Sequence, residues 1–165
     1  MNRNAIRVVD GDEFHRQPRA SIYNGELGEV VIKRASQMTT VRYAPCHPNA
    51  GAQGDAAGHG ETLTTWVFSE DGNTADGISQ TPFNLMVDFV VEPHSAIGLH
   101  RHDDKEEIYY LLEGEMRMTV VTACGEHHSF DLFPGDAHLI RIGQAHYGVA
   151  GSQGARMIAV CVRPA

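Results

Sequence analysis

Apolar and polar residues alternate along most of the chain in short runs, and residues that favour turns separate one run from the next. No stretch shows the sustained 3.6-residue apolar period of an amphipathic helix. Short alternating runs bounded by turn residues favour β-strands. The predicted strands are 5–9, 29–34, 37–43, 62–68, 83–91, 106–112, 115–123, 128–132, 137–142, 146–150 and 156–163. The pattern predicts an all-β fold, an antiparallel sandwich or barrel.

Length and composition set the scale of this fold. The chain has 165 residues, of which 42% are hydrophobic. This is enough for one domain with a core and short for two. We expect a single domain over residues 1–165, in which residues 1–80 provide N-terminal strands and a long loop and residues 82–163 form the barrel core.

The charge, the apolar runs and the cysteines each argue against one class of protein: a nucleic-acid binder, a membrane or secreted protein, and a disulfide-stabilised fold. A net charge of −8 leaves no basic surface for a phosphate backbone, so we expect no nucleic-acid partner. No apolar run reaches the length of a signal peptide or membrane span, which predicts a cytoplasmic protein without membrane association. Cys46, Cys124 and Cys161 are odd in number and form no CxxC pair, which indicates free thiols.

Residues 44–60 interrupt the strand pattern with four Gly and two Pro residues. A loop of this length is uncommon in a compact domain unless it is functional or disordered. Two interpretations stay open. The segment is either a disordered surface excursion or a lid over a pocket, into which His47 and His59 would reach.

Residues 93–114 carry the strongest sign of chemistry. Alternate side chains of a strand share a face, so His100 and His102 would point the same way. The polar trio at 103–105 favours a turn, after which a second strand would bring Glu107 to that face. His146 follows a glycine turn further along the chain and is the natural fourth member of the group.

Three imidazoles and one carboxylate suit a transition metal. Such a set binds Fe(II), Mn, Ni, Cu or Zn and leaves coordination positions for substrate, water or dioxygen. We expect one divalent ion per chain, with Fe(II) favoured, held by His100, His102, Glu107 and His146. Two alternatives remain: Glu106 competes with Glu107, and the histidines are core or surface residues without a metal.

The same residues resemble the two motifs of the cupin superfamily. The first motif, G-x5-H-x-H-x3 or 4-E-x6-G, matches at His100, His102, Glu107 and Gly114, with His94 in place of its leading Gly. The second, G-x5-P-x-G-x2-H-x3-N, matches at Gly135, Gly143 and His146, with Arg141 in place of Pro and Ala150 in place of Asn. The six-residue step to Gly114 favours Glu107 over Glu106.

This resemblance covers roughly residues 94–150. It implies a cupin-type jelly-roll barrel with additional N-terminal strands, the four metal ligands named above, and a homodimer. The departures from the motifs fall on turn positions, so they affect the local backbone rather than the metal.

Other residues have weaker claims to a role. Tyr109 would share the face of Glu107 and act as a general acid or base, or simply line the barrel; a bound cation would lower its pKa. Arg141 would pair with a substrate carboxylate or face solvent. His94 and His138 are candidates for hydrogen bonds to the ligands, whereas Met116 and Met118 are expected to pack inward.

Three functions follow from this set of residues, because the fold hosts unrelated activities. The first is a non-haem metal dioxygenase, an oxidoreductase that acts on a small organic molecule. The second is a redox-neutral lyase, isomerase, decarboxylase or cyclase, in which Tyr109 or a histidine moves a proton. The third is a small-ligand binding module without catalysis.

Overall fold

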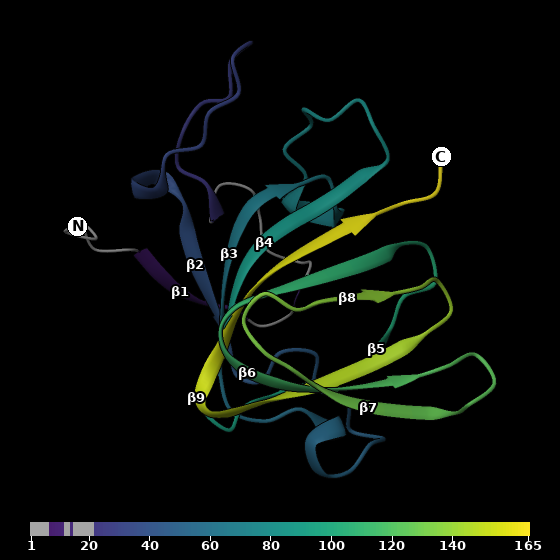
Figure 1. The fold of residues 1–165 in the computed structure, drawn as a ribbon. Coiled ribbons are helices and arrows are strands. Elements are labelled where there is room, and N and C mark those ends of the chain that lie inside the picture. The colour runs from purple at the N-terminus through teal and green to yellow at the C-terminus, as the bar shows by residue number, and fades with distance from the viewer. Residues whose placement is uncertain (1–6, 12–13, 15–21) are drawn as a thin grey trace.

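The computed structural model describes residues 7–11, 14 and 22–165, and their strands form one nine-stranded sheet (Figure 1). The strands are β1 (Arg7–Gly11), β2 (Thr39–Tyr43), β3 (Thr62–Ser69), β4 (Phe83–Val91), β5 (Ala96–Arg101), β6 (Glu106–Val121), β7 (His127–Leu132), β8 (Ala137–Ile140) and β9 (Ala145–Val162). Three short 3-10 helices, η1 (Ala35–Gln37), η2 (Gly54–Ala57) and η3 (Gly72–Thr74), lie in the connections. No helix among the described residues is long and apolar enough to cross a bilayer.

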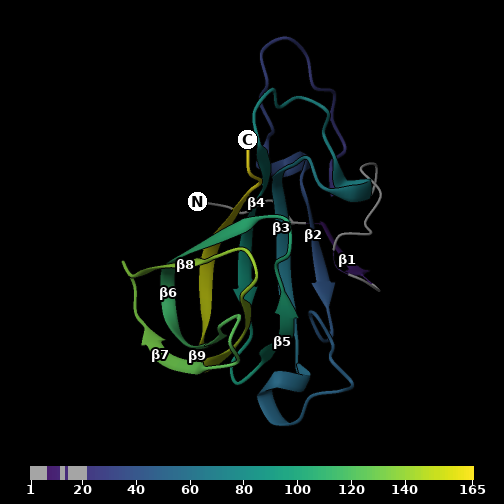
Figure 2. The same cartoon turned by 90° about the vertical axis from the view of Figure 1, so that its right-hand side faces the viewer.

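The sheet folds over into two layers, and the two long strands β6 and β9 run from one layer into the other (Figure 2). The first half of β6 pairs with β8 and its second half with β7. Similarly, β9 pairs with β5 near its start and with β4 near its end. The register between β6 and β9 shifts around Gly114, which has a φ of 76°. A Cβ at Gly114 would also collide with the carbonyl oxygen of Gly154, so only glycine fits this bend.

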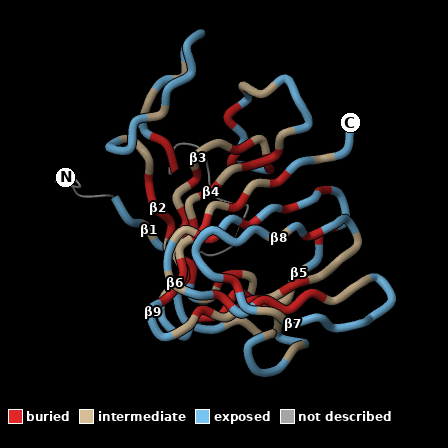
Figure 3. The backbone as a smooth tube through the Cα atoms, in the orientation of Figure 1, coloured by how far each residue is buried: buried red, intermediate tan, exposed pale blue. Residues whose placement is uncertain are grey.

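Alternate residues of the strands pack between the two layers (Figure 3). The buried core includes Val41, Tyr43, Trp66, Leu85, Val87, Leu111 and Met157. Met116 and Met118 are fully buried in it, as expected. The all-β fold and its jelly-roll character are confirmed.

The structure corrects one predicted strand. Residues 29–34 form no strand, and Val30 and Ile32 are 76% and 48% exposed. β-Branched residues favour a strand only where a neighbouring strand and a core face can pack against them, and this segment has neither. Residues 5 and 6 of the first predicted strand lie outside the described residues; the rest of it is found in β1.

Several predicted boundaries merge in the structure. The runs at 106–112 and 115–123 form the single strand β6, and those at 146–150 and 156–163 form β9. Turn-favouring residues between these runs predict separate strands, but Gly114 and Gly154 lie within continuous, bent strands. The predicted break at 103–105 is confirmed, because it separates β5 from β6.

Residues 44–60 are bound along β5 rather than being a disordered excursion. The carbonyl of Cys46 accepts from the amide of Gly98, and the side-chain amide of Asn49 donates to the carbonyl of Leu99. His59 exchanges two backbone hydrogen bonds with Ala96. The loop therefore covers this side of the barrel, as a lid would, although its movement stays a prediction.

Candidate metal centre

Three neighbouring strands deliver the four candidate ligands to one end of the barrel. His100 lies on β5 and His102 just after its end. Glu107 is the second residue of β6, and His146 is the second residue of β9, directly opposite His100. The break at 103–105 reverses the chain, which is why residues of two different strands can face each other here.

The ligand atoms converge closely. The Nε2 atoms of His102 and His146 lie 3.0 Å apart, and each lies 3.2 Å from Oε2 of Glu107. With a donor atom of His100, all four lie within 4.8 Å of one another. Glu107 is buried whereas Glu106 is exposed, so the structure brings Glu107, not Glu106, into the group.

This arrangement fits a metal ion on two counts. Atoms about 2.1 Å from a common ion and at right angles to each other lie about 3.0 Å apart, close to the observed triangle. In addition, although Nε2 of His102 and of His146 each lie 3.2 Å from the buried Oε2 of Glu107, no group among the described residues makes a well-aligned hydrogen bond to it. A buried carboxylate oxygen without a well-aligned hydrogen bond is costly, and a bound cation would satisfy it. The four residues could therefore hold a metal ion.

The protonation states favour the same conclusion. Burial would raise the pKa of Glu107, but His102 and His146 outweigh it and hold that pKa well below its usual range. Burial lowers the pKa of His146 and, with the neighbouring His47, lowers the pKa of His100 well below its usual value. An ionised carboxylate and neutral imidazoles are the forms that bind metals.

His100 is oriented separately from the other three ligands. Its Nδ1 lies 2.9 Å from the carbonyl oxygen of Gly98. A carbonyl can only accept, so Nδ1 carries the proton and the lone pair is on Nε2. The ring also stacks on that of His47, with centroids 3.9 Å apart.

A small cavity adjoins the ligands. Its lining beyond them consists of Phe14, His47, Val87, Phe89, Ile97, Tyr109, Ala159 and Cys161. Its volume of about 10 Å³ accommodates roughly one water molecule, so an organic substrate requires the walls to move. A larger groove of about 390 Å³ lies elsewhere, beside β1, β3 and β4, and none of the four ligands lines it.

Tyr109 lies in the cavity wall as predicted, with its ring centroid 5.6 Å from that of His146. Burial and the charge of Glu107 raise the pKa of Tyr109 well above its usual value. The protein's own groups therefore keep the phenol protonated in the metal-free protein, while the lowering of this pKa by a bound cation stays a prediction. Without a bound metal, Tyr109 is a hydrogen-bond donor rather than a base.

The other candidates lie away from the ligands. Arg141 is exposed between β8 and β9 and does not line the cavity, while His94 is exposed before β5. His138 lies opposite Tyr109 and contacts the ring of Phe130, not a ligand. His127 and His128 are exposed.

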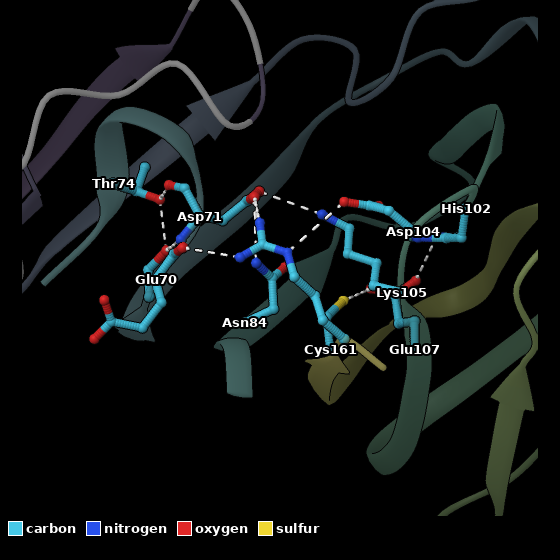
Figure 4. A network of polar contacts seen from close by, with 11 residues as sticks. Glu70, Asp71, Thr74, Asn84, His102, Asp104, Lys105, Glu107 and Cys161 are labelled. Carbon is cyan, nitrogen blue, oxygen red and sulfur yellow. Dashed lines mark hydrogen bonds and ion pairs between the residues drawn. The ribbon is translucent and has the colours of Figure 1, made fainter. Parts of the chain in front are cut away.

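Sequence reasoning missed Cys161, which it treated only as a free thiol. Its Sγ lies 3.5 Å from Oε1 of Glu107, the carboxylate oxygen that faces away from the histidines (Figure 4). Burial and the charge of Glu107 raise the pKa of Cys161, so the thiol stays protonated and donates to the carboxylate. No local motif marks this residue, because only the pairing of β6 with β9 places it opposite Glu107.

Comparisons with known proteins agree with the architecture. A family model described as a cupin domain matches residues 87–163. Solved structures with similar folds include a predicted oxalate decarboxylase from Thermotoga maritima, at 24% identity and a TM-score of 0.52 over 65% of this chain and 84% of the other. An oxalate oxidase aligns at 15% identity and a TM-score of 0.54, over 70% and 55% of the two chains.

A CENP-C domain from Drosophila melanogaster aligns at 11% identity and a TM-score of 0.54, over 81% of this chain and 78% of the other. No curated protein sequence matches the chain. Structural likeness at these identities establishes the fold alone, and the family match covers both segments that supply the ligands. The family match over residues 87–163, together with the fold, therefore supports a member of the cupin superfamily.

Proposed function

We propose that this protein is a metal-dependent oxidoreductase that uses dioxygen to oxidise a small organic molecule. The observation that carries the proposal is the buried triangle of His102, His146 and Glu107, whose facing atoms lie 3.0–3.2 Å apart. Two imidazoles and one carboxylate are the ligand set of many non-haem Fe(II) oxygenases. His100 adds a third imidazole to the set.

A divalent ion bound here would supply a Lewis acid, and in the case of iron a redox centre, with coordination positions left for substrate and dioxygen. The chain's own residues would do the rest. Glu107 contributes the negative charge of the ligand set, and the carbonyl of Gly98 fixes the ring of His100. Val87, Phe89 and Ile97 exclude bulk water, and the Tyr109 phenol offers a hydrogen bond to a bound molecule.

A redox-neutral decarboxylase or related lyase is the second candidate. The observation in its favour is the protonated Tyr109, which can deliver a proton to a carbanion in the cavity. The fold is also similar to that of a structure described as a predicted oxalate decarboxylase. In this alternative a metal held by the four residues would supply only a Lewis acid.

Elemental analysis of anaerobically purified protein, followed by dioxygen-uptake assays, separates the two candidates. Iron or copper together with substrate-dependent dioxygen uptake supports the oxidoreductase. Manganese, nickel or zinc with turnover in the absence of dioxygen supports the lyase. Protein that binds none of these metals would contradict both and leave a small-ligand binding module.

A further inference from the structure

A buried carboxylate outside the metal centre forms ion pairs with two basic side chains at the edge of the barrel. Asp71 follows β3 and is 9% exposed. Its Oδ2 lies 3.3 Å from Nζ of Lys105, and its Oδ1 lies 2.9 Å from Nη2 of Arg163. The side-chain amide of Asn84 also donates to Oδ1. Figure 4 shows these contacts meeting at one carboxylate.

Lys105 and Arg163 lie one residue beyond the ends of β6 and β9, and β6 carries the candidate ligand Glu107. Glu106 of β6 pairs with Val162 of β9, so the next residues outward, Lys105 and Arg163, face each other. Like charges in directly opposed positions destabilise a strand pair. The carboxylate of Asp71 binds both cations and offsets their repulsion.

One step inward from Glu106 and Val162, Glu107 pairs with Cys161. The thiol of Cys161 donates to Oε1 of Glu107, which leaves Oε2 turned towards His102 and His146. Lys105, which contacts Asp71, is therefore two residues from Glu107 along the chain. Arg163, the other partner of Asp71, is two residues from Cys161. A displacement of the strand ends would move Glu107 relative to the histidines.

The loop that carries Asp71 is itself fixed. The carboxylate of Glu70 accepts hydrogen bonds from the backbone amides of Gly77, Ile78 and Ser79. The hydroxyl of Thr74 donates to the carbonyl of Asp71. Asp71 is thus held from its own side and can act as a rigid attachment point.

We propose that Asp71 is a positioning residue of the metal centre: by binding Lys105 and Arg163, it holds the β6–β9 strand pair so that Glu107 faces the histidines. The inference rests on the proposed metal site and extends it to a residue that touches neither the ion nor the substrate. Residues that orient metal ligands typically change metal affinity by about 10–100-fold when they are replaced.

The test compares Asp71→Asn with Asp76→Asn by titration of the metal-free protein with Co²⁺, followed by visible absorption. Asp76 is a matched control because it is a buried carboxylate of the same loop and pairs with Lys33 at 2.6 Å, away from the ligand turn. Both variants should lower the melting temperature. Only Asp71→Asn should weaken Co²⁺ binding, by about 10-fold or more.

Two further variants test whether the effect of Asp71 passes through its partners Arg163 and Lys105 and does not arise from misfolding. Arg163→Gln changes a side chain that is 38% exposed and should weaken Co²⁺ binding by about threefold or more. In a Lys105→Met background, Asp71→Asn should have a smaller effect than in the wild type, because the two residues act together.

Three results would overturn the inference. The first is Co²⁺ binding by Asp71→Asn within about twofold of the wild type, and the second is an equal loss in Asp76→Asn, which would indicate a general effect of destabilisation. If the wild-type protein itself does not bind Co²⁺, the metal site and the role of Asp71 both fail. Normal wild-type binding with an unaffected Asp71→Asn removes the role of Asp71 alone.

Discussion

The imidazole rings of His47 and His100 lie nearly parallel, with 11° between their planes and 3.9 Å between their centroids. His47 belongs to the long loop at 44–60 and reaches β5 because that strand has a glycine at position 98. A side chain at Gly98 would collide with the carbonyl oxygen of His47. The loop therefore places one aromatic face against His100, a candidate metal ligand.

The variants His47→Phe and His47→Ala distinguish two possible roles of His47: stacking of its ring on His100, and contacts made by its imidazole nitrogens. If stacking orients His100, Phe should keep Co²⁺ affinity within about twofold, whereas Ala should weaken it about 10-fold. Chelator competition measures both affinities. Equal losses in the two variants would instead assign the effect to the nitrogens of His47.

His102→Ala should remove the metal, because it takes away one corner of the triangle formed with Glu107 and His146. Glu106→Gln should leave the metal bound, because that side chain is exposed on the opposite face of β6. Elemental analysis of the purified variants provides the measurement. Full occupancy in His102→Ala would refute the ligand assignment.

The metal-free protein should lose stability on acidification below about pH 6.5. The pKa values of His100 and His146 are lower in the folded protein than in the unfolded chain, so the unfolded chain takes up protons first as the pH falls. The free energy of unfolding then decreases by up to about 1.4 kcal/mol per pH unit for each histidine. The pKa of Glu107 is also lowered in the folded protein, so the free energy of unfolding decreases further at lower pH, where this carboxylate becomes protonated.

Urea unfolding of the metal-free protein between pH 8 and pH 5 measures this dependence. His100→Gln should reduce the slope. His128→Gln should leave it unchanged, because His128 is exposed at the end of β7. A pH-independent unfolding free energy over this range would contradict the neutral state of the buried histidines.

Tyr109→Phe tests the two catalytic candidates. If dioxygen performs the oxidation, the phenol only orients the substrate, and kcat should fall by less than about 10-fold. If Tyr109 donates the proton in a redox-neutral reaction, its loss should cost about 100-fold or more. Metal content must be equal in both proteins. A large loss without dependence on dioxygen would argue against the oxidoreductase.

His94→Gly should stabilise the protein by about 0.5–1 kcal/mol. His94 has a φ of 57°, in the left-handed region that costs a non-glycine residue about 1–2 kcal/mol. The greater freedom of glycine in the unfolded chain offsets part of the gain. Thermal unfolding provides the measurement, with His94→Ala as the control, since Ala has the same backbone restriction and should give no gain.

The sequence predicted which four residues come together and most of the strands that carry them. Parity along an extended chain, together with the polar break at 103–105, predicted that His100, His102 and Glu107 share one face, and the structure shows it. These are local properties of the backbone, so a short window of sequence contains them. The same reasoning failed at 29–34, because β-branched residues without a packing partner do not form a strand.

Only the tertiary structure decided which distant groups surround the ligands. Asp71 reaches Lys105 and Arg163, and Cys161 reaches Glu107, because β6 pairs with β9 in one particular register. His47 reaches His100 because its loop is bound along β5. Alternation along a strand shows which face a side chain occupies, but the choice of neighbouring strand depends on the packing of the whole core. The pKa of Tyr109 rises mainly because the assembled barrel buries its phenol, and that burial depends on the packing of distant strands; the second cause, the charge of Glu107, comes from a residue two positions away on the same strand.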